Sequence, residues 1–94
     1  MPAKRKPAET FDEYVGDAVE SAMHRARLTQ AQLAAAAGMP FSTFKRSIHG
    51  TRGFLVRELA VVAGVLGVPA RSFTEDALRR SGGPSSLRPP SDGA

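Results

Sequence analysis

The residues of this chain that are best suited to chemistry lie between positions 41 and 46, where hydroxyl and basic side chains follow one another closely. The guanidinium group of Arg46 can bond two acceptors at once, and guanine presents O6 and N7 side by side at its major-groove edge. Lys45 can bond a base or neutralise a phosphate, and the hydroxyl groups of Ser42 and Thr43 can bond base edges or backbone oxygens. These side chains indicate a hydrogen-bonding surface for nucleic acid.

Two short helices are predicted to position this surface. Thr29 with Gln32 three residues later is a capping-box pattern, and Gly38 supplies a left-handed residue that ends a helix. The first helix therefore runs from Gln30 to about Ala37, and the second from Phe41 to about His49. In the second helix, residues three and four apart share a face, so Phe44 and Ile48 are expected to point into the core and the polar residues outward.

Three further helices complete the prediction of an all-α, five-helix domain. One runs from Phe11 to about Arg27, one from about Val56 to Leu66, and a short one begins at Pro69 and reaches Phe73, or Arg80 if Thr74 caps another turn. The expected buried stripe of the helix after Thr10 is Phe11, Val15, Ala18, Ala22 and Ala26, flanked by Tyr14, Val19 and Met23. That of the helix after Leu55 is Leu59, Val62, Ala63 and Leu66.

The domain organisation follows from composition. Residues 10–80 are predicted to form the domain, residues 1–9 a flexible basic arm, and residues 81–94 a flexible tail rich in Gly, Pro and Ser. The chain has 94 residues, which is enough for one core.

The charges are unevenly distributed. The chain has 13 basic and 9 acidic residues, yet between positions 21 and 57 there is no acidic residue. The basic residues of that segment are Arg25, Arg27, Lys45, Arg46, Arg52 and Arg57. If the helices pack as expected, they form one positive face suited to a polyanion. The alternative is a solvated run of charges without a partner.

Several classes of function are not expected. The chain has no cysteine, which excludes thiolate zinc sites and cysteine catalysis and fits a reducing, cytoplasmic compartment. His24 and His49 stand far apart, so neither a metal nor another cofactor is expected, and nothing indicates an enzyme. No apolar run approaches the roughly 20 residues that span a bilayer, so no membrane association is expected.

Residues 30–73 resemble the lambda-repressor-like, or Cro-like, helix-turn-helix proteins of the XRE class. The similarity is carried, in order and without gaps, by Thr29-Gln30, Leu33-Ala34, Ala37-Gly38, Ser42-Thr43-Phe44, Arg46, Gly50, Leu59, Ala63 and Leu66-Gly67-Val68. Pro40 stands where the family usually has a capping Ser or Thr, and Phe41 where relatives often have a polar residue that faces DNA. The resemblance implies a five-helix DNA-binding fold whose helix over residues 41–49 enters the major groove.

The resemblance and the residue chemistry together give three sets of candidate residues. Base contacts are expected from Phe41, Ser42, Thr43, Lys45 and Arg46, and phosphate contacts from Gln30, Thr51, Arg52, Lys4, Arg5 and Lys6. The expected dimer surface is Val68, Phe73, Ala77 and Leu78. Alternatives stay open for several of these residues. Phe41 meets a thymine methyl group or packs inward, and Arg46 pairs with an acid of the helix over residues 11–27. Ser42 only caps the backbone, and the basic arm serves solubility.

The function predicted from the sequence is a sequence-specific regulator of transcription that binds double-stranded DNA. The expected form is a repressor, of phage immunity or Cro-like type, that reads a palindromic operator as a homodimer. An antitoxin that represses its own promoter is the alternative, and a protein partner would then be a toxin or, for a phage repressor, an antirepressor. A third hypothesis is an interaction module that has lost DNA binding.

Overall fold

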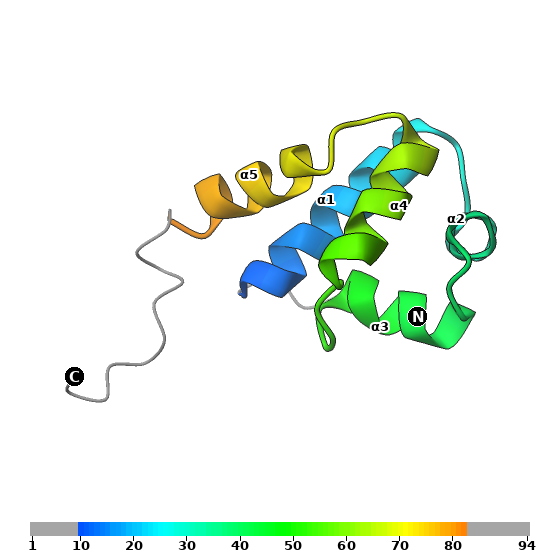
Figure 1. Cartoon of the computed structure of the whole chain (residues 1–94). Coiled ribbons are helices and arrows are strands. Elements are labelled where there is room, and N and C mark those ends of the chain that lie inside the picture. The colour runs from blue at the N-terminus through cyan, green and yellow to red at the C-terminus, as the bar shows by residue number, and fades with distance from the viewer. Residues whose placement is uncertain (1–9, 83–94) are drawn as a thin grey trace, which may run out of the picture.

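A computed structural model describes residues 10–82 of the chain, and over this range it contains helices and no strand. The helices are α1 (Phe11–Arg25), α2 (Gln30–Ala37), α3 (Phe41–His49), α4 (Val56–Leu66) and α5 (Arg71–Arg80). The predicted all-α, five-helix class is confirmed (Figure 1). None of the helices in the described range is long and apolar enough to cross a membrane. Lys4, Arg5 and Lys6 of the predicted arm, and positions 83–94 of the predicted tail, lie outside the described residues.

The local signals read from the sequence act as expected at the helix ends. Thr10 Oγ1 accepts the Glu13 N–H at 3.1 Å, and the Glu13 carboxylate accepts the Thr10 N–H at 2.9 Å. Thr29 and Gln32 make the same reciprocal pair at 3.0 and 2.9 Å. Such capping boxes satisfy N–H groups that the first helical turn leaves without a partner.

Two helix boundaries differ from the prediction. α1 ends at Arg25 rather than about Arg27, because Arg27 adopts a left-handed φ of 59° that no helix continues. α5 begins at Arg71, two residues after Pro69, and runs unbroken to Arg80. Thr74 therefore lies inside the helix, where its hydroxyl donates to the Arg71 carbonyl at 3.0 Å.

The core lies between α1 and the other helices, which pack around it (Figure 1). Leu59, Val62 and Ala63 of α4 are buried as predicted, and Leu66 packs against them half-buried. In α1 the prediction was partly wrong: Val19 and Met23, expected at the flank, are 0% and 2% exposed, whereas Ala26 is exposed. The reason is that α1 contacts α3 on one side and α5 on another, so its buried surface is wider than a single stripe.

Candidate nucleic-acid interface

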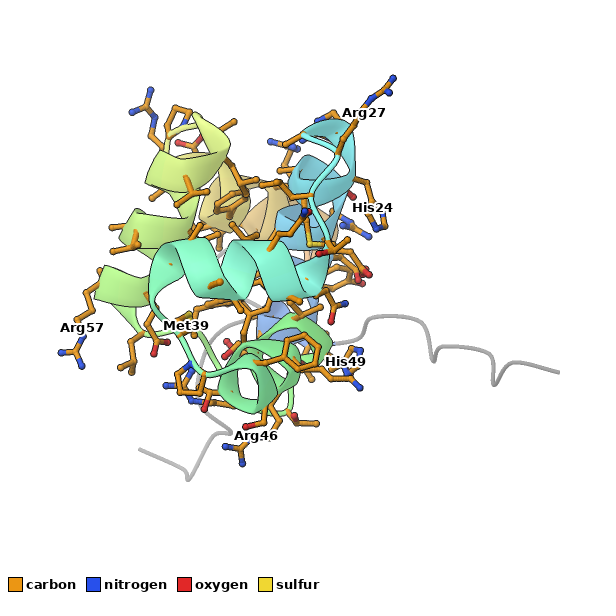
Figure 2. All side chains as sticks on the ribbon, turned by 90° about the vertical axis from the view of Figure 1, so that its right-hand side faces the viewer. His24, Arg27, Met39, Arg46, His49 and Arg57 are labelled. Atoms are coloured by element: carbon orange, nitrogen blue, oxygen red, sulfur yellow. The ribbon has the colours of Figure 1, made fainter. Side chains whose placement is uncertain are left out.

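α2 and α3 are joined by a tight turn that fixes their relative orientation. Gly38 adopts a φ of 71°, and the N–H of Met39 donates to the Ala34 carbonyl at 2.9 Å. The Met39 side chain is 8% exposed, so it anchors the turn in the core. α2 crosses the body of the protein and α3 lies below it (Figure 2). Pro40 precedes α3 and offers no side-chain acceptor to the first turn, as the sequence indicated.

α3 has one buried and one exposed face. Phe44 and Ile48 are fully buried, and the ring of Phe44 meets Phe54 edge-to-face with 6.0 Å between the ring centroids. Thr43 is half-buried at the margin. The outward residues of α3 are Phe41, Ser42, Lys45, Arg46 and His49. The outward face therefore carries four of the five residues expected to contact bases.

Phe41 belongs to the outward face. Its side chain is 49% exposed, the largest aromatic exposure in the described residues. The sequence left open whether Phe41 meets a thymine methyl group or packs inward, and in the structure it does not pack inward. An aromatic ring at the first position of an exposed helical face can meet apolar groups of a ligand.

Arg46 extends from α3 away from the body of the protein (Figure 2). Within residues 10–82 no ion pair engages its guanidinium group, so the alternative pairing with an acid of α1 is not observed. Its five N–H donors are therefore available to an external acceptor.

The positive charges of residues 21–57 do not all gather on one face, which corrects the sequence expectation. Arg27 lies at the end of the protein opposite to Arg46, and Arg57 extends from α4 at the side (Figure 2). The Arg52 guanidinium forms an ion pair with the Glu58 carboxylate at 2.9 Å. The positive surface at α3 therefore has fewer basic residues than the sequence predicted.

α1 fixes the position of α3 through a glycine that the sequence analysis did not single out. Gly16 is buried, and a Cβ atom at this position would overlap the carbonyl oxygen of Ile48 and lie 3.1 Å from that of Ser47. Only a residue without a side chain lets the two helices approach so closely. A glycine inside a helical pattern is the signal that could have indicated this contact.

An ionic network ties the end of α3 to the start of α4. The Arg52 guanidinium donates to both carboxylate oxygens of Glu58, at 2.9 and 3.0 Å, and to the buried hydroxyl of Ser47 at 2.8 Å. Glu58 also accepts the Leu55 N–H at 2.9 Å. We call these four residues the Arg52 network. It stabilises the loop that connects α3 to α4.

This network changes the roles predicted for the loop after α3. The Arg52 side chain was expected to contact phosphate, but three of its five guanidinium N–H groups donate to Ser47 and Glu58 within the protein. The hydroxyl and the N–H of Thr51 both donate to the Arg46 carbonyl, at 3.2 and 3.1 Å. Both donors of Thr51 and three of the five Arg52 guanidinium N–H groups are engaged in this arrangement, so we assign both residues to holding the loop.

Glu58 makes the stability of this region depend on pH. The hydrogen bonds from Arg52, with smaller effects of the Leu55 N–H and of the Arg52 and Arg57 charges, lower its pKa, although burial opposes the change. A carboxylate whose pKa is lower in the folded than in the unfolded state stabilises above the unfolded pKa, and this contribution is lost as the pH falls through the folded pKa.

The Glu58→Gln variant is therefore expected to be less stable than the wild type at neutral pH, with the difference shrinking at roughly pH 3. Urea unfolding at both pH values measures this difference. The matched control is Glu75→Gln, because Glu75 lies 3.9 Å from Arg71 with both side chains largely exposed and should contribute little. A difference for Glu58→Gln that does not change with pH would contradict the assignment.

Gln30 occupies the first position of α2, next to the N–H groups of its first turn. Its side chain is half-buried and lies at the helix end that favours negative charge. Gln30 therefore lies where it could meet a phosphate group, and the contact stays a prediction.

The predicted dimer surface is wrong for two of its four residues. Phe73 and Ala77 are 2% and 0% exposed, because they pack in the core of the single chain where α5 lies along α1. Val68 and Leu78 are half-buried. A second copy cannot meet Phe73 and Ala77 without opening this core.

In the described part of the chain, no three His, Asp or Glu side chains lie close enough together to hold a metal ion. His24 and His49 extend from different helices, α1 and α3 (Figure 2).

The fold of this chain is similar to that of solved structures. No protein-family model matches the chain, and no curated protein sequence matches it. Two crystal structures of the clp gene regulator ClgR from Corynebacterium glutamicum superpose on it with TM-scores of 0.73 and 0.70, both at 21% sequence identity. The first superposition covers 81% of each chain, and the second covers 80% of this chain and 95% of that one. At this identity the likeness is one of fold.

Proposed function

We propose that this protein is a sequence-specific regulator of transcription that reads double-stranded DNA with the outward face of α3. The single observation that carries this proposal is that face itself, on which Ser42, Lys45 and Arg46 stand exposed with the Arg46 guanidinium free of any described ion pair. An exposed helix of this size fits the major groove, where arginine discriminates guanine by a bidentate contact.

Two further observations support this proposal. The α2-turn-α3 unit holds the exposed helix on a rigid core, which is what base reading requires. The fold is similar to that of a protein described as a gene regulator. We propose the finer role of a repressor that covers a palindromic operator as a homodimer, because one α3 helix reads only a few base pairs.

Phosphate contacts would fix the register of α3 on the duplex. We propose that Gln30 and the first turn of α2 make one such contact, as helix N-termini do with anions. The basic arm with Lys4, Arg5 and Lys6 is proposed to add a sequence-independent attraction.

The proposal is tested by selecting sequences from random DNA that the protein binds, followed by fluorescence-anisotropy titrations at several salt concentrations. We expect an enriched palindromic sequence and an affinity that falls steeply as salt rises. Salt-sensitive binding without sequence enrichment would contradict base reading. No binding at low salt would refute the function altogether.

Phe41 is expected to read thymine through its methyl group. Replacing the relevant thymine of the selected site by uracil removes only that methyl group and should weaken binding by the wild type several-fold, since burying one methyl group contributes about 0.8 kcal/mol. The Phe41→Ala variant should bind both sites equally. Titrations of the two proteins against the two DNAs form a double-mutant cycle, and equal losses in both proteins would show that Phe41 does not touch this methyl group.

A further inference from the structure

An apolar cleft opens where α1, α4 and α5 begin. It has a volume of about 350 Å³, and its apolar lining comes from Phe11, Val15, Phe54, Leu59, Ala60 and Ala70. The cleft belongs neither to the exposed face of α3 nor to the Arg52 network. Apolar surface of this kind commonly marks an interaction site.

A prominent apolar side chain stands at the edge of this cleft. Val56 lines it and is 88% exposed, and the neighbouring Leu55 is 44% exposed. The same surface therefore carries both an apolar protrusion and an apolar hollow. A two-fold contact between identical chains matches such a surface with itself, because the protrusion of each copy can enter the hollow of the other.

The charged residues of the cleft support the same partner. Asp12 of α1 and Arg71 of α5 line it and have opposite signs. Arg71 has only a distant contact of 3.9 Å with Glu75, and 75% of its side chain is exposed. In a two-fold contact, Asp12 of one copy can meet Arg71 of the other, and this pairing occurs twice.

We propose that a second copy of this chain occupies the cleft, with Val56 of each protomer seated in the cleft of its partner. This inference rests on the proposed function, because its use lies in placing two α3 helices on one duplex. In both figures α3 lies at the bottom of the protein. A two-fold axis that runs from top to bottom beside the cleft would keep both α3 helices on that side, as an operator of two half-sites needs.

The experiment is sedimentation equilibrium of the full-length protein without DNA, from micromolar to millimolar concentration. We expect the wild type to form dimers and Val56→Asp to weaken association by about tenfold or more, because the contact would bury an unpaired carboxylate. An acid at the first position of α4 suits the helix dipole, so the fold should be retained, and circular dichroism checks this. The matched control is Val61→Asp, a 46%-exposed valine of α4 that does not line the cleft, which should dimerise like the wild type.

A charge exchange tests the predicted pairing. Arg71→Asp should weaken the dimer, and adding Asp12→Arg should restore it, since the exchanged charges again have opposite signs. A monomeric wild type, or equal association of Val56→Asp and the wild type, would overturn the inference.

Binding of each variant to a single half-site keeps this result separate from the proposed function. Loss of the dimer with intact half-site binding is the expected result for Val56→Asp. A wild type that binds the half-site but never dimerises would leave the proposed function standing and refute the cleft. A wild type that dimerises but binds no DNA would refute the proposed function and leave the cleft contact standing.

Discussion

Replacing Gly16 by alanine is expected to destabilise the protein by about 2–4 kcal/mol, because the added methyl group has no room between α1 and α3. It would overlap the carbonyl oxygen of Ile48 and approach the carbonyl carbon of the same residue to 2.7 Å. Backbone atoms cannot rotate away as the end of a side chain can, so the two helices must move apart. For a domain of this size the melting temperature should fall by roughly 4–8 °C for each kcal/mol.

A second helical glycine provides the matched control for this measurement. Gly64 lies within α4, and a Cβ atom there would meet nothing within 4 Å. Gly64→Ala should therefore stabilise the protein by about 0.5–1 kcal/mol through helix propensity alone. Thermal and urea unfolding of both variants give the comparison. Similar effects of the two substitutions would contradict the close contact at Gly16.

The Gly16→Ala substitution should also weaken DNA binding, because the same contact positions α3. α3 is held at its C-terminal end by Gly16, so the variant that still folds should present Arg46 in a shifted position. We expect Gly16→Ala to weaken binding to the selected site more than to random DNA. This follows because a displaced helix loses base contacts before it loses its general attraction to phosphate.

Arg46→Ala is expected to weaken binding to the selected operator by about 1–3 kcal/mol and to relax the preference at one guanine position. The Arg46 side chain extends outward from α3 and makes no ion pair within residues 10–82 that the substitution would remove. The substitution should therefore leave the free energy of unfolding nearly unchanged. Repeating the selection with the variant measures the preference, and anisotropy titration measures the affinity. Uniform weakening at every sequence would mean that Arg46 contacts only phosphate.

A control for the lost charge comes from the opposite end of the protein. Replacing Arg27 removes the same charge as replacing Arg46. The left-handed φ of 59° at position 27 is one that glycine adopts readily. Arg27→Gly should therefore keep the fold and change operator affinity little. An equal loss in both variants would indicate that net charge, rather than a contact of Arg46, accounts for the effect.

Helix formation in this chain was predictable because its signals are local. The Thr10 and Thr29 capping boxes and the glycines that end α2 and α3 lie within a few residues of the groups they satisfy. The inward position of Phe44 and Ile48 followed in the same way from helical spacing.

What the sequence could not predict depends on contacts between distant residues. Arg52 looked like a free cation, yet it forms hydrogen bonds with Glu58 and Ser47. Phe73 looked available for a partner, yet it is buried in the core, where α5 packs along α1. The cleft beside Val56 also exists only because the starts of three helices meet.

By itself, the sequence determined which segments are helical and which side of α3 carries the polar residues, since both depend on neighbours along the chain. Only the tertiary structure decided which charges are free, which apolar residues are covered and how closely α1 approaches α3. These properties depend on which surfaces the packed helices bring together, and that arrangement leaves Arg46 outward and draws Arg52 inward.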